Sequence, residues 1–165
     1  MKTSQILKHT RDIILLPFMV TIIAPWFIYS YSPGIIPGFI SIKIFAMAVF
    51  TAGILLFGWT IYLFQIIANG TLAPWTEKQR LVVTGPYAYC RNPMISGVLF
   101  MLIGEGLWLR SVPILTWAAI FFVINTLFFI FREEPFLENK FGEEYKAYKR
   151  KVPRWIPKLN TRPSA

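Results

Sequence analysis

The stretch ISIKIFAMAVFTAGILLFGWTIYLFQIIA, Ile40 to Ala68, decides the fold class. Nearly all of its side chains are apolar, and Lys43 is its one charged residue. At about 1.5 Å per residue, a helix over this range is longer than a hydrocarbon core about 30 Å thick. We therefore expect a membrane-spanning helix that tilts or projects beyond the bilayer.

Further apolar segments of similar character lie on both sides of this stretch, at residues 13–31, 94–109 and 112–131. Pro17 and Pro25 interrupt the first, which membrane helices tolerate when neighbours satisfy the freed backbone groups. Only Arg110 and Ser111 separate the last two, so we expect an antiparallel helical hairpin there. The sequence thus predicts an all-α polytopic membrane protein with four transmembrane helices.

The totals agree with this class. The chain has 165 residues, enough for one domain over 1–165, with 55% hydrophobic residues, 15% charged residues and a mean hydropathy of +0.52. Nine of the 17 Lys and Arg follow Phe131, next to a predicted span, although the net charge of +9 alone could suggest a nucleic-acid partner. Basic residues in this position are typical of an anchor near anionic lipid, so we expect a bilayer and no nucleic acid.

The positive charges also predict the orientation of the chain. Fifteen Lys and Arg fall before the first span, between the second and third, or after the fourth, and two, Lys43 and Arg110, fall on the other side. The positive-inside rule then places both termini and the loop 70–93 in the cytoplasm. The loop and the tail 132–157 hold most of the polar residues, so both face the same compartment.

Few catalytic classes fit the reactive side chains. Cys90 is the only cysteine and His9 the only histidine, so a disulfide framework, a Cys/His metal site and a histidine-dependent nucleophile are not expected. Glu105 is ionisable within the third span, which makes it a functional candidate by default. It lies near the outer end beside Arg110, and we favour snorkelling or pairing with that residue.

The segment VVTGPYAYCRNPM, Val82 to Met94, has two possible roles. As a connector, Gly85-Pro86 forms a turn and Asn92 caps the helix that begins with proline. As a ligand site, the helix N-terminus suits an anionic group, and Arg91 can bind a carboxylate through two parallel hydrogen bonds. Tyr87 and Tyr89 offer flat faces for an aromatic ring. Residue spacing alone leaves both roles open.

The tail REEPFLENKFGEEYKAYKRK predicts an amphipathic helix, with an apolar stripe of Leu137, Phe141, Tyr145 and Tyr148. Pro135 should bend or restart the helix. Such a stripe is typical of a helix lying on the membrane surface, and Trp155 is expected to be an interface anchor. Neither feature explains why Glu133 and Glu134 follow the last span directly.

The runs LVVTGPYAYCRNPMISG and EEPFLENKFGEEYKAYKRKVPRWIP together resemble the isoprenylcysteine carboxyl methyltransferase and phospholipid methyltransferase group of integral membrane enzymes. The resemblance covers roughly residues 70 to 157. It implies an enzyme that uses S-adenosylmethionine and methylates a lipid-like acceptor at the cytosolic face.

The resemblance also implies site residues. Catalytic candidates are Arg91, Glu133 and Glu134, and Glu133 also matches the glutamate that closes over the cofactor. The cofactor-binding candidates are Gln79, Arg80, Leu81, Val82, Gly85, Tyr87, Asn92, Pro93, Met94, Ile95 and Glu133. No metal site is implied.

The sequence departs from the family pattern at three positions. Asn92 replaces the motif histidine and Ile95 replaces the motif tyrosine. Phe129 stands where the isoprenylcysteine enzymes place an arginine that meets the substrate carboxylate, and Arg132 is the nearest cation. We therefore expect a methyltransferase with a hydrophobic acceptor, and an acceptor amine of a phospholipid as the alternative to a carboxylate. A lipid-binding membrane protein without catalysis is the alternative of another class, and the sequence leaves the oligomeric state open.

Overall fold

The computed structural model describes residues 17–32, 40–67 and 81–158, with the side chains of Phe64 and Gln65 excepted. Every element in these ranges is helical, as the sequence predicts. In chain order they are η1 (Met19–Ile23), α2 (Ala24–Tyr31), α3 (Ile40–Ile67), η2 (Gly85–Ala88), α4 (Pro93–Trp108), α5 (Val112–Phe128), η3 (Phe129–Glu133), α6 (Glu134–Phe141) and α7 (Glu143–Lys151).

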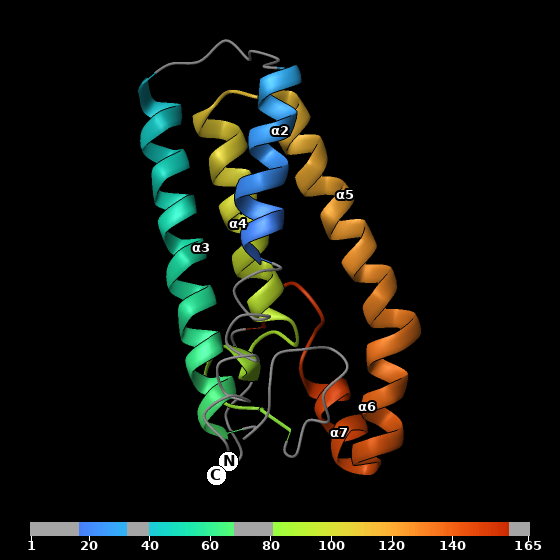
Figure 1. Cartoon of the computed structure of the whole chain (residues 1–165). Helices are drawn as coiled ribbons and strands as arrows, with labels where there is room; N and C mark the ends of the chain where they lie inside the picture. The colour runs from blue at the N-terminus through green and yellow to red at the C-terminus, as the bar shows by residue number, and fades with distance from the viewer. Residues whose placement is uncertain (1–16, 33–39, 68–80, 159–165) are drawn as a thin grey trace, which may run out of the picture.

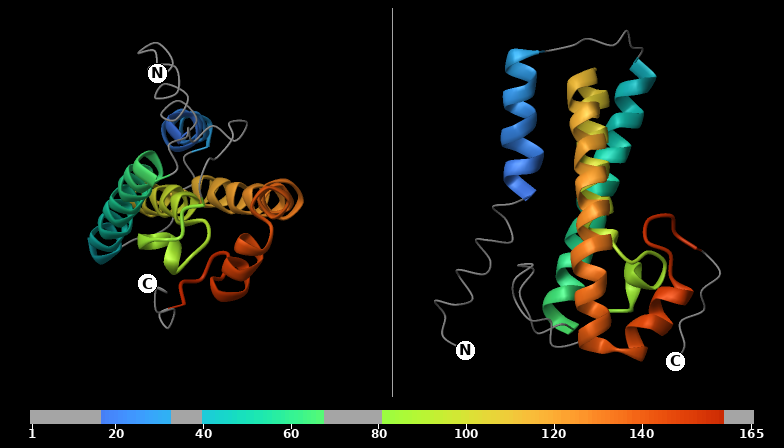
Figure 2. Two further views of the ribbon diagram at one scale, coloured as in Figure 1. Left: turned by 90° about the horizontal axis from the view of Figure 1, so that it is seen from below. Right: turned by 90° about the vertical axis from the view of Figure 1, so that its right-hand side faces the viewer.

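The long helices stand side by side and alternate in direction. In Figure 1, α2 and α4 run upward while α3 and α5 run downward, and α6 and α7 lie at the lower end. Figure 2 shows α4 in the centre, flanked by α3, α5 and α2. The end of α3, the start of α4 and the tail helices therefore meet at one end of the bundle.

Among the described residues, two helices are long and apolar enough to cross a membrane, over Ile40–Leu63 and Val112–Phe141. The other two predicted spans are apolar but shorter in the described part of the chain, at Met19–Tyr31 and Pro93–Trp108. The 16 residues of α4 correspond to about 24 Å at 1.5 Å per residue.

Small residues let α3 and α4 approach closely. A Cβ atom added at Gly53 would lie 2.7 Å from the Gly97 carbonyl oxygen, and one at Gly104 would lie 2.7 Å from the Phe50 backbone nitrogen. Ala46 is fully buried in the same seam. Contacts through small residues are typical of membrane helix pairs, because apolar side chains gain little from leaving lipid. The seam fixes the position of α4, which carries Arg91 and Asn92 at its start.

The predicted hairpin between α4 and α5 is present. Arg110 adopts a left-handed φ of 54°, and the Ser111 amide donates to the Gly106 carbonyl oxygen over 2.9 Å. The buried Ser111 hydroxyl then caps α5 by accepting from the Ile114 amide. The expected pair of Glu105 with Arg110 is wrong, because no ion pair joins these two described residues.

The region after the last predicted span differs from expectation. The helix does not end at Phe131 or restart at Pro135, but continues through the wide π-helical turn η3 into α6. Pro135 lies in the first turn of α6, directly after this π-helical turn. The single amphipathic helix is also wrong, because Gly142, with a φ of 53°, separates α6 from α7.

Candidate functional site

The turn 81–92 lies against the inner end of α3. Gly85 has a φ of 61°, and a Cβ atom there would meet Leu63 and Trp59 of α3. Glycine is therefore required both for the backbone conformation and for the close approach. Tyr87 and Cys90 amides donate to the carbonyl oxygens of Thr84 and Pro86, which close the 3-10 turn η2. The turn buries Val82 and Tyr87, while Leu81 is half-buried.

The tail returns across this turn and binds it along its length. The Arg91 amide donates to the Pro153 carbonyl oxygen over 2.9 Å, and the Lys158 amide donates to the Tyr89 carbonyl oxygen over 3.2 Å. The Tyr148 hydroxyl donates to the Tyr87 carbonyl oxygen over 2.7 Å. We call these contacts, together with those of Cys90 below, the clasp. It brings the two motif-bearing parts of the chain together.

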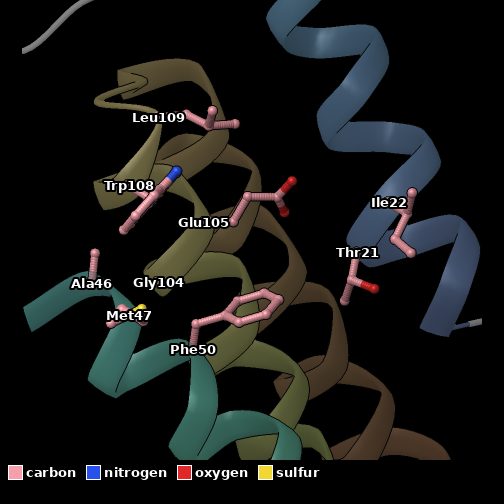
Figure 3. Close-up of a pocket in the computed structure, with 9 residues that line it drawn as sticks. All are labelled: Thr21, Ile22, Ala46, Met47, Phe50, Gly104, Glu105, Trp108 and Leu109. Atoms are coloured by element: carbon pink, nitrogen blue, oxygen red, sulfur yellow. The ribbon is translucent and has the colours of Figure 1, made fainter. Parts of the chain in front are cut away.

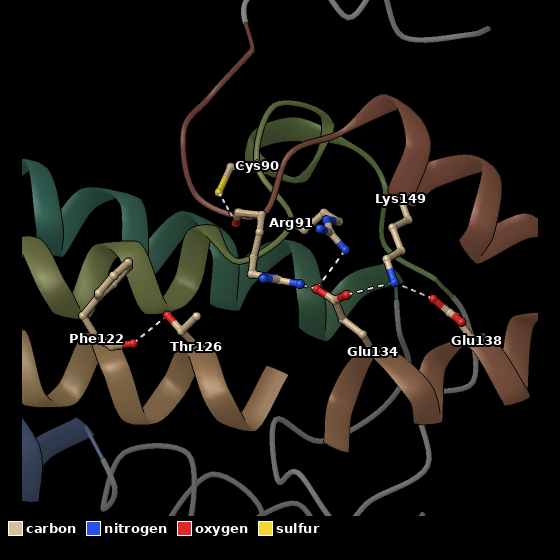
Figure 4. Close-up of polar contacts among 8 residues, drawn as sticks. Cys90, Arg91, Phe122, Thr126, Glu134, Glu138 and Lys149 are labelled. Carbon is tan, nitrogen blue, oxygen red and sulfur yellow. Dashed lines mark hydrogen bonds and ion pairs between the residues drawn. The ribbon is translucent and has the colours of Figure 1, made fainter. Parts of the chain in front are cut away.

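Cys90 lies inside the clasp. Its buried Sγ lies 3.2 Å and 3.3 Å from the carbonyl oxygens of Arg154 and Trp155 (Figure 4 shows the first contact). Burial raises the pKa of the thiol, and the neighbouring hydrogen bonds and the charge of Arg91 offset this only in part. A neutral thiol that donates to the backbone is a structural group rather than a nucleophile.

Glu134 is the centre of the charged cluster shown in Figure 4. Its carboxylate lies 2.9 Å from Arg91 Nη1 and 3.1 Å from Lys149 Nζ, and it accepts a hydrogen bond from Arg154 Nε over 2.7 Å. Lys149 also donates to Glu138 over 2.7 Å. Glu134 thus ties the start of α4, α7 and the tail together.

Arg91 keeps unused hydrogen-bonding capacity. Its Nε atom is buried and makes no hydrogen bond, whereas Nη1 is paired with the Glu134 carboxylate over 2.9 Å. Trp155 Nε1 is likewise buried without a hydrogen-bond partner. Buried donors of this kind are rare in folded proteins, because desolvation without a partner costs free energy. Both are suited to an acceptor group of a ligand.

Trp155 lies in an aromatic contact within the protein. Its ring packs against Phe122 at a centroid distance of 5.0 Å and against Phe129 at 5.8 Å. Phe129 is buried, so the position at which the related enzymes place an arginine is part of an apolar contact between α5, η3 and the tail. The predicted amphipathic stripe also packs inside the protein, since Leu137 and Tyr145 are buried.

Asn92 occupies the N-cap position of α4, as predicted, but its side chain makes no capping hydrogen bond. Pro93 is buried behind it, and Met94 is half-buried. Ile95 packs against the apolar cluster of α4 and α5 that contains Leu102. The side chain of Asn92 is therefore not committed to the cap.

Glu133 is half-buried at the end of η3. Burial of Tyr87 is the largest cause of its raised pKa, and the negative charge of Glu133 is the second largest. The two side chains are therefore close. Gln79 and Arg80 lie outside the described residues. The structure thus gathers Arg91, Glu133 and Glu134 at the end of the bundle that also holds the turn 81–92.

Sequence reasoning missed four residues of the clasp and of the charged cluster around Glu134: Tyr148, Lys149, Pro153 and Arg154. Tyr148 was assigned to the apolar stripe, and the others were treated only as part of a basic tail. The sequence KVPRW, at the end of the second motif, could have indicated that this segment belongs to the site, because it places a proline, a basic residue and an aromatic residue next to one another. Within the described ranges, no group of three or more His, Cys, Asp or Glu could hold a metal ion.

Three relatives match parts of the chain. It is 41% identical over 63 residues to an uncharacterized protein of Haemophilus influenzae, which is 38% of this chain and 100% of that protein. It is 36% identical over 87 residues to protein-S-isoprenylcysteine O-methyltransferase B of Arabidopsis thaliana, and 31% identical over 84 residues to the cobalt-zinc-cadmium resistance protein CzcN of Cupriavidus metallidurans. Both matches cover 51% of this chain, but only 43% and 38% of those two proteins.

The model of one protein family matches most of the chain, over residues 41–144. The matched region contains α3, the turn 81–92, the α4–α5 hairpin and Glu134, and so includes most of the elements that form the site. By this match, the chain belongs to the phospholipid methyltransferase family.

Proposed function

We propose that this protein is an S-adenosylmethionine-dependent methyltransferase that acts on a lipid-like acceptor at the cytosolic membrane face. Family membership and the similarity to an isoprenylcysteine O-methyltransferase support a membrane methyltransferase. The observation that carries the finer proposal is the clasp, which joins residues 61 to 69 positions apart in sequence beside Arg91.

The residues present fit the methyl donor. S-adenosylmethionine carries a carboxylate, and the buried Nε atom of Arg91 is a donor that lacks a hydrogen-bond acceptor. The half-buried Leu81, which precedes the buried Val82, offers an apolar side chain that suits its adenosine part. When bound, the donor supplies an electrophilic methyl group, which a lone pair of the acceptor takes from sulfur to leave S-adenosylhomocysteine.

The chain's own residues then mainly bind and align the reactants, because an in-line displacement needs positioning more than acid or base strength. We assign Glu134 to positioning, since three cations surround its carboxylate and it holds Arg91 in place. We assign Glu133 to the proton that an amine acceptor must lose before or during attack. The positive-inside distribution of Lys and Arg supports four spans with both termini and this site in the cytoplasm.

Phe129 favours an amine acceptor over a carboxylate. Its buried ring packs on Trp155 where a carboxylate-binding arginine would otherwise stand. A neutral amine needs no such cation. The phospholipid amine is therefore our preferred acceptor class, with a prenylated carboxylate as the alternative.

Binding of S-adenosylhomocysteine tests the first part of the proposal. Calorimetry on the purified full chain in detergent should show saturable binding, and Arg91→Ala and Glu133→Gln should each weaken it at least about tenfold, or about 1.4 kcal/mol. Arg150→Ala, an exposed residue of α7, is the matched control and should bind like the wild type. Absence of binding at millimolar ligand would refute the methyltransferase proposal and leave a non-catalytic lipid-binding protein.

A radiolabelled-methyl assay on a total lipid extract identifies the acceptor. Label that survives mild base indicates an amine, as we expect, whereas label released by base indicates an ester and hence a carboxylate acceptor. Label in the ester fraction would contradict the argument from Phe129 but not the methyltransferase activity.

A further inference from the structure

A separate pocket of about 370 Å³ opens between η1, α3 and α4, toward the end of the bundle opposite the clasp (Figure 3). Its volume falls in the range of small-molecule sites, roughly 300 to 1,000 Å³. Most of the wall is apolar, with Ile22 from η1, Met47 and Phe50 from α3, and Trp108 from α4. The η1 turn packs against α4 and α2 against α5, but neither packs closely against α3 in the described residues, so this side of the bundle is loosely closed.

Glu105 is the one charged residue in the wall of this pocket. Figure 3 shows its carboxyl group directed from α4 toward the side of Thr21 and Ile22. The Oε2 atom is buried and makes no hydrogen bond within the described ranges. A buried carboxyl without a partner is costly in an apolar site, so a donor supplied by a ligand would lower the free energy of this arrangement.

The nearby cation does not fill this role. Lys43 extends from α3 to the Trp108 ring, with its ammonium 5.7 Å from the ring centroid, and forms no ion pair with Glu105 among the pairs in the described part of the chain. The pocket therefore combines an apolar wall, an uncompensated carboxyl group inside and a positive charge beside Trp108.

We propose that this pocket binds a single-chain amphiphile with a protonated amine head. The amine donates hydrogen bonds to Glu105, and the alkyl chain lies against Ile22, Met47 and Phe50. Ile22, Met47 and Trp108 are exposed on the face that an apolar bilayer would cover, so the ligand can enter sideways from lipid.

The pocket is not the methyl-transfer site. Glu105 lies 12 residues beyond Pro93 on the same helix, which at 1.5 Å per residue is about 18 Å along its axis. Methyl transfer requires the reacting atoms to be in contact, so an amine at Glu105 cannot be methylated beside Arg91. The inference therefore does not depend on the proposed function.

Photo-crosslinking tests the proposal directly. The full chain is reconstituted in phosphatidylcholine nanodiscs and labelled with dodecylamine that carries a diazirine in its alkyl chain. We expect saturable adducts in the α3 peptide containing Met47 and Phe50, which unlabelled dodecylamine displaces. Glu105→Gln should weaken the apparent affinity at least about tenfold, whereas Lys43→Gln should strengthen it because a like charge is removed.

Two controls separate head-group recognition from general partitioning. The corresponding dodecanol probe should label wild type and Glu105→Gln equally, since it carries no charge. Ile22→Trp should block labelling by filling the pocket, while Ile23→Trp, one residue along but outside the wall, should not. These two variants keep the test valid if Glu105→Gln fails to fold.

Labelling that does not saturate, or that spreads over the lipid-facing helix surfaces, would overturn the proposal. Equal affinity of the amine for wild type and Glu105→Gln would overturn it as well. A result in which the alcohol binds as tightly as the amine would show an apolar crevice without selection for charge.

Discussion

Replacing Glu134 by glutamine is the most informative test of the charged cluster. The substitution keeps the size of the side chain and removes one negative charge from among Arg91, Lys149 and Arg154. The Glu134 side chain is only 6% exposed, and that of Arg91 10%. The variant therefore leaves a buried guanidinium without its counter-charge.

The magnitude follows from these exposures. Removing one partner of a fully buried ion pair costs about 3–5 kcal/mol. Lys149 and Arg154 are 39% and 25% exposed, so water can partly solvate them once they are unpaired, and the glutamine oxygen still accepts one hydrogen bond. We therefore expect Glu134→Gln to lower the free energy of unfolding by about 2–3 kcal/mol.

Glu138→Gln is the matched control. Glu138 pairs with the same Lys149, but both side chains are about one-third exposed, so this pair is worth about 0.5 kcal/mol. Denaturant unfolding in detergent, followed by tryptophan fluorescence, measures both variants. A loss below 0.5 kcal/mol for Glu134→Gln, or equal losses for the two variants, would refute the reasoning.

Three other predictions follow from the packing and titration of the described residues. Gly53→Ala should destabilise the protein by about 1–3 kcal/mol, because its Cβ would lie 2.7 Å from a backbone oxygen of α4, whereas Gly58→Ala, with nothing within 4 Å, should be neutral or stabilising in the same denaturant assay. Cys90 should react with a maleimide at least about tenfold more slowly in the folded protein than after denaturation, because it is buried and its pKa is raised, and rapid labelling of the folded protein would contradict the clasp. Burial raises the pKa of Tyr148, so its contribution to stability is present below the ordinary tyrosine pKa of about 10 and is lost as the pH rises above it. The wild type should thus lose more unfolding free energy between pH 9 and about 11 than Tyr148→Phe, while Tyr31→Phe, at an exposed position, should behave like the wild type.

The sequence predicted the helices well because apolar composition reports directly on burial in lipid. The α4–α5 hairpin could also be predicted, since only two residues connect Leu109 and Val112 and so short a connection between two membrane spans makes them antiparallel neighbours. The α3–α4 seam was not predicted. The sequence shows that Gly53 and Gly97 are small residues, but it does not show which helix each of them faces.

The site was predicted less completely. Arg91 and Glu134 could be named from motif resemblance, but their contact depends on a tertiary arrangement that no local pattern encodes. Gly142 lies within the range predicted as one amphipathic helix, although its positive φ ends α6 there. Trp155 was assigned to the membrane interface because its amphipathic ring suits that location as well as it suits the contact with Phe122.

The α4–α5 hairpin has a consequence for the entropy of forming the site. The residues that the clasp joins are 61 to 69 positions apart, and closing a flexible loop of about 60 residues would cost roughly 3.6 kcal/mol from its length alone. The hairpin returns the chain to the same end of the bundle, so most of this cost is met when the two helices pack. The tail then needs only to close the short connection after α7. Substitutions at the distant turn, such as at Ser111, should therefore loosen the clasp without touching any of its residues.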